Sequence, residues 1–222
     1  MPLFFWGVGI ISPHLKHVKP QSRMQAMRIR ILLIGLAFLP YFNGKAFAQV
    51  EMVQIPGETY SMDKYLVTQG EYEKEMGKNP SFFKGSNLPV ETVTWYEAKD
   101  YCRKLGKRLP TESQWEKAAR GGAITDYYWG NSEGDISRYA WYVGNSNGKT
   151  HPIGQKEPNR FGLYDMAGNV WEWIADDRNN NGKYKVLRGG SWFSLPADMR
   201  SSSRGTFSPD YSYSSVGFRC SK

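Results

Sequence analysis

Cysteine and histidine are scarce in this chain of 222 residues, and this limits the chemistry that its side chains can perform. The two cysteines, Cys102 and Cys220, lie far apart in the sequence. A redox-active dithiol usually pairs neighbouring thiols, so that one thiolate attacks and the other resolves, and the wide spacing therefore favours a structural disulfide. Of the three histidines, only His151 lies beyond residue 48.

The first 48 residues contain no acidic side chain, and their apolar run, Ile31–Leu39, is too short for a bilayer span of ~20 residues. Basic residues precede that run, and Ala46-Phe47-Ala48 follows it with the small-residue spacing of a signal-peptidase site. We therefore expect residues 1–48 to be a signal peptide, with Met27 as an alternative start, and the mature protein to be periplasmic or secreted. An uncleaved membrane anchor is the other interpretation of this segment.

No large charge excess is left in the mature chain. Removing residues 1–48 removes six of the 29 Lys and Arg and none of the 21 Asp and Glu, which lowers the net charge from +8 to about +2. This near-neutral balance argues against a nucleic-acid partner. No long apolar stretch follows, so we expect residues 49–222 to form one domain without a stable membrane span.

Three segments carry a capping box, in which a threonine and a Glu or Gln three residues later satisfy each other's backbone N–H groups at a helix start. They begin at Thr68, Thr94 and Thr111. The second predicts a helix that stops at Gly106 with Cys102 facing the core, and the third predicts a helix from Pro110 to Gly121-Gly122. Helical periodicity then disappears, and short pieces such as 185–188 and 216–220 predict strands between long loops. The expected class is α+β.

One segment, 162–173, reads GLYDMAGNVWEW and combines two acidic side chains with a flexible turn. Asp165 and Glu172 supply anionic oxygens, and Gly168 permits a sharp turn that could aim backbone carbonyls at the same point. Such oxygens suit calcium, which takes six to eight of them. The spacing equally allows both carboxylates to be solvated or to bond the turn while Trp171 and Trp173 fill the core.

The surrounding motifs occur in a specific order: Val67-Thr68, Asn79-Pro80-Ser81, Pro89-Val90, GKRLPTE at 106–112, Trp115-Glu116, Arg120-Gly121-Gly122, Asn159, GLYDMAGNVWEW, RGGSW at 188–192 and GFRC at 217–220. Together they resemble the sulfatase-modifying-factor family, whose founding member is the formylglycine-generating enzyme. The resemblance covers essentially the whole mature chain. It implies a variant of the C-type-lectin-like fold with few helices, short strands and long ordered loops.

The same resemblance implies a calcium site at the Asp165 and Glu172 side chains and the Gly168 and Val170 carbonyls. Asp165 replaces the more usual asparagine, which keeps an oxygen ligand and adds charge. A second ion of the family uses a longer loop than 141–159, so that site is not expected here. The resemblance also implies a disulfide between Cys102 and Cys220.

Copper chemistry is not expected. The copper-binding cysteine pair of the formylglycine-generating enzyme begins at the position of Ser194, its second cysteine has no counterpart here, and a serine hydroxyl is a poor ligand for copper(I). Ser191 and Arg204 match residues of the family's active-site pocket. His151 reads as a surface-loop residue rather than a base for Ser191.

Three aromatic residues, Trp171, Trp192 and Phe193, are candidates either for a peptide groove or for the core. The sequence favours an exported, calcium-stabilised module that binds a peptide or protein partner. The alternative is an enzyme without copper that modifies a peptide-derived substrate by oxidoreductase-type chemistry, in protein or siderophore maturation, as in the family's pyoverdine branch. Whether the chain is an enzyme stays open at this point.

Overall fold

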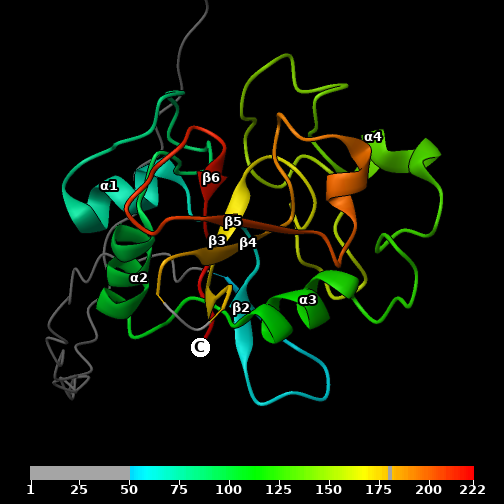
Figure 1. The fold of residues 1–222 in the computed structure, drawn as a ribbon, viewed down its shortest axis with the longest axis horizontal. Coiled ribbons are helices and arrows are strands. Elements are labelled where there is room, and N and C mark those ends of the chain that lie inside the picture. Colours follow the sequence, from blue (N-terminus) through cyan, green and yellow to red (C-terminus); the bar gives the residue numbers. More distant parts are fainter. Residues whose placement is uncertain (1–50, 180–181) are drawn as a thin grey trace, which may run out of the picture. The chain divides into compact units, whose positions relative to one another are not determined.

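The computed structural model of the chain describes residues 51–179 and 182–222 (Figure 1). The predicted signal peptide 1–48 and the alternative start at Met27 lie outside these residues. Within the described residues, no helix has the length and apolar character needed to cross a membrane.

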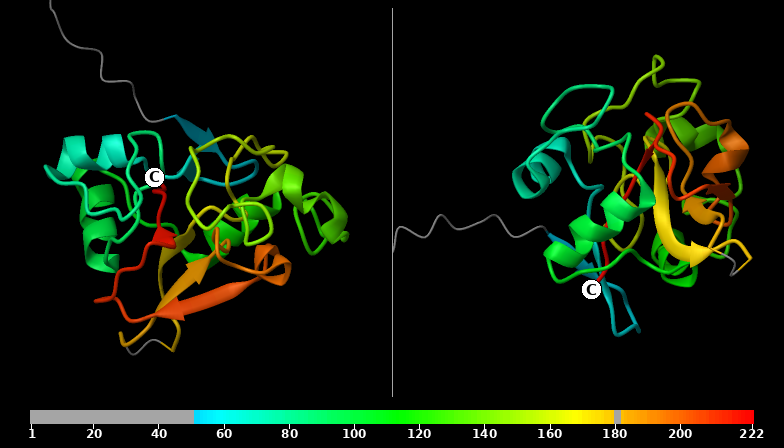
Figure 2. Two further views of the ribbon diagram at one scale, coloured as in Figure 1. Left: turned by 90° about the horizontal axis from the view of Figure 1, so that it is seen from above. Right: turned by 60° about the vertical axis from the view of Figure 1, so that its left-hand side comes forward.

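The described residues form a mixed α and β structure with short elements and long connections, as the sequence predicts. The elements are β1 (Met52–Gln54), β2 (Ser61–Asp63), α1 (Gln69–Met76), α2 (Trp95–Lys104), α3 (Glu112–Arg120), η1 (Glu133–Asp135), α4 (Ile136–Tyr139), β3 (Trp171–Asp177), β4 (Lys185–Arg188), η2 (Pro196–Met199), β5 (Arg204–Phe207) and β6 (Val216–Gly217). Figures 1 and 2 show α1 and α2 together at one end of this structure, and α4 and η2 at the other.

All three predicted capping boxes are present. The side chains of Thr68, Thr94 and Thr111 each accept a hydrogen bond from the backbone N–H three residues later. The Glu or Gln side chain at that later position in turn accepts a hydrogen bond from the threonine N–H. The helices are slightly shorter than predicted. The helix α2 ends at Lys104, before the predicted stop at Gly106, and α3 begins at Glu112 and not at Pro110. The predicted strand 185–188 is β4, whereas only Val216–Gly217 of the segment 216–220 is strand.

A four-stranded sheet with the order β5-β4-β3-β6 lies at the centre. β3 pairs antiparallel with β4, β4 pairs antiparallel with β5, and β6 runs parallel to β3. In this register Glu172 stands between Arg188 on one side and Gly217 on the other. A Cβ atom at Gly217 would lie 2.3 Å from the Val90 carbonyl oxygen, so only glycine permits this approach.

Two hydrophobic clusters fill the interior. One gathers Trp115, Ala118 and Ala119 of α3 with residues of β2, β3, β4 and several loops, and the other gathers α2 with β3 and the C-terminal segment. Cys102 and Cys220 lie fully buried in the second cluster and form a disulfide across 118 residues, as predicted. The bond therefore ties α2 to the end of the chain.

We expect loss of this disulfide to lower the free energy of unfolding by roughly 4–5 kcal/mol, because so long a closed loop restricts the unfolded chain strongly. Urea unfolding with and without a thiol reductant measures the loss. The variant Cys102→Ala/Cys220→Ala should show the same loss and no response to the reductant. Equal stability of the oxidised and reduced protein would contradict this expectation.

Candidate functional site

The turn before β3 has an unusual backbone. Asp165, Gly168 and Asn169 all have positive φ, at 52°, 79° and 64°. Left-handed conformations are costly for residues other than glycine and persist only where the surroundings impose them. Gly168 is required for a second reason, because a Cβ atom there would lie 2.2 Å from the Trp141 carbonyl oxygen. The sequence predicted the sharp turn at Gly168, but not the positive φ at its neighbours.

Contacts from distant segments hold this turn in place. The Gly168 N–H donates to the Gly189 carbonyl at 2.8 Å, and the Asn169 N–H donates to the Trp141 carbonyl at 2.9 Å. The Asn169 side chain exchanges two hydrogen bonds with the His151 backbone, at 3.0 and 3.1 Å. The turn is therefore a rigid junction of several loops.

The sequence suggested that His151 lies on an exposed surface loop, but the residue belongs to this junction. Its ring is half-buried and stacks on Trp141, with 3.7 Å between ring centroids. Its Nε2 atom lies 2.8 Å from the Ser146 carbonyl oxygen. The ring thus packs within the loops, and no hydrogen bond joins it to Ser191 among the described residues.

Both candidate calcium carboxylates are buried. Glu172 Oε2 accepts a hydrogen bond from Arg219 Nε at 2.8 Å, and Asp165 Oδ2 accepts one from the Gly154 N–H at 2.8 Å. Glu172 Oε1 has no hydrogen-bond partner in the described structure, and neither does the Trp115 indole N–H. The indole N–H nevertheless lies near the Glu172 carboxylate and lowers its pKa. Burial dominates and raises the pKa of both Asp165 and Glu172.

Arg219 is the central cation of this region, and sequence reasoning missed its role. Its guanidinium is fully buried and, besides Glu172, donates to the carbonyl oxygens of Asp63, Lys64, Tyr164 and Asp165. The motif GFRC contained the signal, since a lone arginine between apolar residues needs a buried anion.

A second buried ion pair adjoins this one. Lys107 Nζ lies 2.5 Å from Asp63 Oδ1, and Asp63 Oδ2 accepts the Cys220 N–H at 3.0 Å. The carboxylates of Asp63, Asp165 and Glu172 therefore lie close to the cations Lys107 and Arg219. The ammonium group of Lys156 adds a third positive charge that acts on Asp165 and lowers its pKa.

The donor set fits a hard cation only if backbone oxygens take part. Within the described residues, no three His, Cys, Asp or Glu side chains gather into a metal cluster. Two carboxylates and the carbonyls of Gly168 and Val170 make four oxygens, and calcium accepts such mixed sets with water completing the shell. The unpartnered Glu172 Oε1 is the atom that such an ion would satisfy.

The candidate pocket serines form a local turn. The hydroxyls of Ser191 and Ser194 lie 3.2 Å apart, and the Ser194 hydroxyl accepts the Ser191 N–H at 3.1 Å. Ser191 Oγ also accepts the Phe193 N–H at 3.3 Å. Both serines are buried, and neither hydroxyl contacts an acid or a base among the described residues. An activated serine nucleophile requires such a base.

Arg204, the third candidate of that pocket, forms no hydrogen bond with either serine among the described residues. It lies on β5 opposite Arg188 on β4, and its side chain pairs with Glu112 at 2.9 Å. The carboxylate at the start of α3 thus holds the Arg204 side chain in an ion pair.

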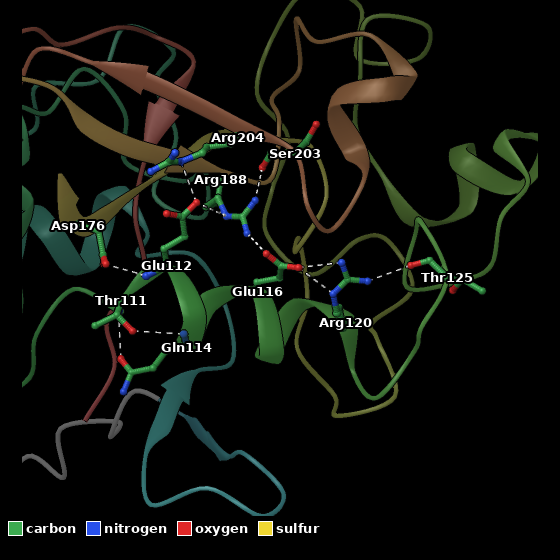
Figure 3. A network of polar contacts seen from close by, with 10 residues as sticks. All are labelled: Thr111, Glu112, Gln114, Glu116, Arg120, Thr125, Asp176, Arg188, Ser203 and Arg204. Carbon is green, nitrogen blue, oxygen red and sulfur yellow. Dashed lines mark hydrogen bonds and ion pairs between the residues drawn. The ribbon is translucent and has the colours of Figure 1, made fainter. Parts of the chain in front are cut away.

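This ion pair belongs to an ionic network beside α3 (Figure 3). The buried Arg188 pairs with Glu116 and donates to the Ser203 carbonyl, and Arg120 pairs with Glu116 at 2.7 Å. A surface hollow of about 580 Å³ lies beside it, lined by Glu112, Ser113, Glu116, Lys117, Arg120 and Asp176. The network thus joins the motifs RLPTE, WE and RGG through ion pairs of Arg188 with Glu112 and Glu116.

The aromatic candidates separate into two groups. Trp171 begins β3 and packs half-buried against the α2 cluster. Trp192 instead contacts Phe83 and Phe193 edge to face, with centroids 5.5 and 5.6 Å apart. Its indole N–H donates to the Ser214 carbonyl at 3.0 Å. Trp192 and Phe193 thus share one ring cluster, and Trp171 makes no ring contact with them among the described residues.

We name the exposed region around Trp192 the aromatic surface, and it consists of Phe82, Phe83, Trp192, Phe193 and Leu195. Phe82, Phe193 and Leu195 are 72%, 69% and 64% exposed, whereas Phe83 and Trp192 are half-buried. Exposed apolar groups that cluster in this way mark interaction sites more often than scattered ones do. Phe82 and Phe83 were not identified from the sequence, because no periodic pattern surrounds them.

A buried carboxylate anchors one side of the aromatic surface. Glu91 Oε1 accepts the Phe83 N–H at 2.8 Å, and its other oxygen accepts the Thr92 hydroxyl at 2.5 Å. Thr92 has φ 58°, which is rare for a β-branched residue and shows that its surroundings impose the conformation. Glu91 makes no ion pair with a described residue, and burial raises its pKa.

This raised pKa predicts a stability that depends on pH. The folded protein holds the Glu91 proton more tightly than the unfolded chain does, so stability should fall as pH rises from about 4.5 through the raised pKa. Relative to Glu91→Gln, the wild type should lose free energy of unfolding as pH rises above about 4.5. Chemical denaturation at several pH values measures this difference in the free energy of unfolding. The variant Glu73→Gln, on the exposed face of α1, is the control. A difference between wild type and Glu91→Gln that stays constant with pH would disprove the expectation.

Known proteins are similar to this chain in sequence and in fold. Residues 40–222 match the family described as the sulfatase-modifying factor enzyme 1-like domain, a range that begins inside the predicted signal peptide. The chain is 40% identical over 151 residues to a serine/threonine-protein kinase, pkn1, of Chlamydia pneumoniae, covering 60% of this chain and 24% of the kinase. It is 35% identical over 173 residues to the formylglycine-generating enzyme of Mus musculus, covering 65% of this chain and 46% of that enzyme. It thus spans less than half the length of both relatives.

Two solved structures are similar across most of the domain. The Treponema denticola variable protein 1 has a TM-score of 0.68 and 31% identity, covering 73% of this chain and 84% of that one. PvdO from Pseudomonas aeruginosa has a TM-score of 0.65 and 28% identity, covering 73% and 79%. The chain belongs to the sulfatase-modifying factor family and has its formylglycine-generating-enzyme-like variant of the C-type-lectin-like fold.

Proposed function

We propose that this protein is an exported, calcium-stabilised member of its family that binds a peptide or protein partner through the aromatic surface. The observation that carries the proposal is the chain of ring contacts from Phe82 through Phe83 and Trp192 to Phe193, with both ends exposed. Aromatic side chains supply much of the binding energy of protein interfaces at a small cost in conformational entropy.

The loops that present these rings are held rigidly, which favours binding. Glu91 fixes the loop of Phe83, and the turn of Ser191 and Ser194 fixes that of Phe193. The Val143 N–H also donates to the Ser194 carbonyl at 3.1 Å. A surface ordered before its partner arrives loses less entropy on association.

Calcium would be held by the Asp165 and Glu172 carboxylates and by the Gly168 and Val170 carbonyls. Its role would be structural, because it would satisfy the unpartnered Glu172 Oε1 and fix the turn before β3. The disulfide and the predicted signal peptide fit an oxidising compartment outside the cytoplasm, where calcium is also more abundant.

The structure of the serine turn argues against formylglycine generation by copper. The Ser194 hydroxyl stands where the family's copper chemistry needs a thiolate, the second copper-binding cysteine has no counterpart, and the two cysteines of the chain are joined to each other elsewhere. Copper(I) prefers soft sulfur ligands, so this donor set does not fit it.

A second candidate function is an enzyme without copper that acts on a peptide-derived substrate. The likeness to PvdO favours it, since that protein shares this fold at 28% identity. The two candidates differ in one measurable respect, because an enzyme would convert its partner chemically and a binding module would release it unchanged. Mass spectrometry of the partner before and after contact separates them.

Chelation tests the calcium proposal. EGTA should lower the melting temperature of the wild type by about 5–10 °C if calcium is present at ~100 times its Kd. Asp165→Ala should abolish this response, and Asp165→Asn should retain part of it because the amide keeps an oxygen ligand. Asp165 is the better position for this test because Glu172 also pairs with Arg219. A wild type whose melting temperature ignores EGTA would rule out the site.

A matched pair of variants tests the binding proposal. Phe193→Ser removes an exposed ring from the aromatic surface and should weaken partner recovery from the native extracellular or periplasmic fraction about tenfold or more. Ile124→Ser is the control, because Ile124 is 98% exposed but outside the aromatic surface, and it should recover the partner as the wild type does. Quantitative mass spectrometry measures recovery, and equal recovery by both variants would refute the proposal.

A further inference from the structure

A loop rich in tyrosine and serine adjoins the aromatic surface. It reads SPDYSYSS over residues 208–215, between β5 and β6, and we name it the tyrosine loop. Tyr211 and Tyr213 are 58% and 43% exposed. The Tyr213 ring stacks on Phe207 with 4.7 Å between centroids, and Tyr211 meets Tyr213 edge to face at 6.4 Å. The loop therefore presents two exposed rings that pack on each other.

Hydrogen bonds join the tyrosine loop to both parts of the aromatic surface. The Trp192 indole N–H donates to the Ser214 carbonyl at 3.0 Å. The Thr92 N–H donates to the Tyr213 carbonyl at 3.0 Å, and Thr92 directly follows the carboxylate that anchors Phe83. The loop is thus ordered beside the aromatic surface before any partner arrives, which reduces the entropy lost on association.

The aromatic surface and the tyrosine loop together have the composition of a protein-binding surface. The cores of protein interfaces are enriched in Tyr, Trp and Phe and depleted of Lys, Glu and Asp. Asp210 is the one charged residue in these two regions. Tyrosine next to serine is also typical of antibody binding loops, in which tyrosine supplies rigid contact area and serine supplies adaptable hydrogen bonds.

From this arrangement we infer that the tyrosine loop is a second contact region for the partner, and that the partner is a folded protein that spans the loop and the aromatic surface. The rings of Tyr211 and Tyr213 pack against that protein, and their exposed hydroxyls exchange hydrogen bonds with it. The inference rests on the proposed binding function and adds two contact residues and the class of partner.

The structure of these loops favours a folded protein over a short peptide. Recurring modes of peptide recognition use a sheet edge or a groove between regular elements. The segments 82–83, 192–195 and 211–213 belong to no helix or strand of the described structure, so the contact comes from separate loops. An anionic membrane is disfavoured because acidic lipids attract clusters of four to eight cations, and these segments contain none.

Binding of one recovered protein tests this inference. The probe is the protein that the wild type recovers from the native extracellular or periplasmic fraction and that Phe193→Ser does not, identified by mass spectrometry and purified intact. Tyr211→Ser and Tyr213→Ser should each weaken its binding about fivefold or more, because interface tyrosines often carry a large share of the binding energy. Biolayer interferometry measures the Kd values.

Three controls separate contact from folding. Tyr213→Phe should bind more tightly than Tyr213→Ser, because it keeps the ring that stacks on Phe207. Ile124→Ser should bind as the wild type does, and Tyr211→Ser should keep the wild-type melting temperature, because Tyr211 is largely exposed. Overlapping 15-residue synthetic peptides of the recovered protein should bind about tenfold more weakly than the intact protein or worse, since each supplies only part of the interface.

The contrary outcomes are distinct. Wild-type affinity in both tyrosine variants, with Phe193→Ser still defective, would overturn the role of the tyrosine loop and leave the binding function intact. A single peptide that binds as tightly as the intact protein would overturn the folded-protein class. A fraction that yields no protein in preference over Phe193→Ser would overturn both the inference and the proposed function.

Discussion

The buried ion pair between Arg219 and Glu172 is the interaction on which the rest of the structure depends. It joins the C-terminal segment to β3, and the remaining donors of Arg219 satisfy carbonyl oxygens from the loop after β2 and from the turn before β3. Removing one partner of such a pair leaves an uncompensated buried charge at a cost of about 3–5 kcal/mol. The neighbouring disulfide fixes the same C-terminal segment covalently to α2.

Long loops keep one conformation here because polar contacts replace the regular hydrogen bonds of helices and sheets. The Asn169 side chain exchanges two hydrogen bonds with the His151 backbone. The Asn159 side-chain amide donates to two backbone carbonyls at the end of α3. Each of these side chains serves groups that no sheet or helix would otherwise satisfy. The same rigidity lets two separate loops present the aromatic surface without a regular element beneath them.

Local signals in the sequence predicted the local structure well. The capping boxes at Thr68, Thr94 and Thr111 act within four residues, so their chemistry can be identified without knowledge of the fold. The motif order identified the family, and the disulfide between Cys102 and Cys220 followed from there being only two cysteines. The positive φ of Asp165 and Thr92 could not be predicted, because contacts from remote segments impose it.

The sequence by itself determined the helix starts, the disulfide, the turn at Gly168 and the presence of Ser194 at the position of a copper-binding cysteine. Only the tertiary structure decided which side chains meet. It paired Arg204 with Glu112, packed Trp171 against the core, and brought Phe83 to Trp192 across more than a hundred residues. The physical reason is that capping and turn formation depend on neighbours in the chain, whereas burial and ion pairing depend on neighbours in space, which long loops bring together.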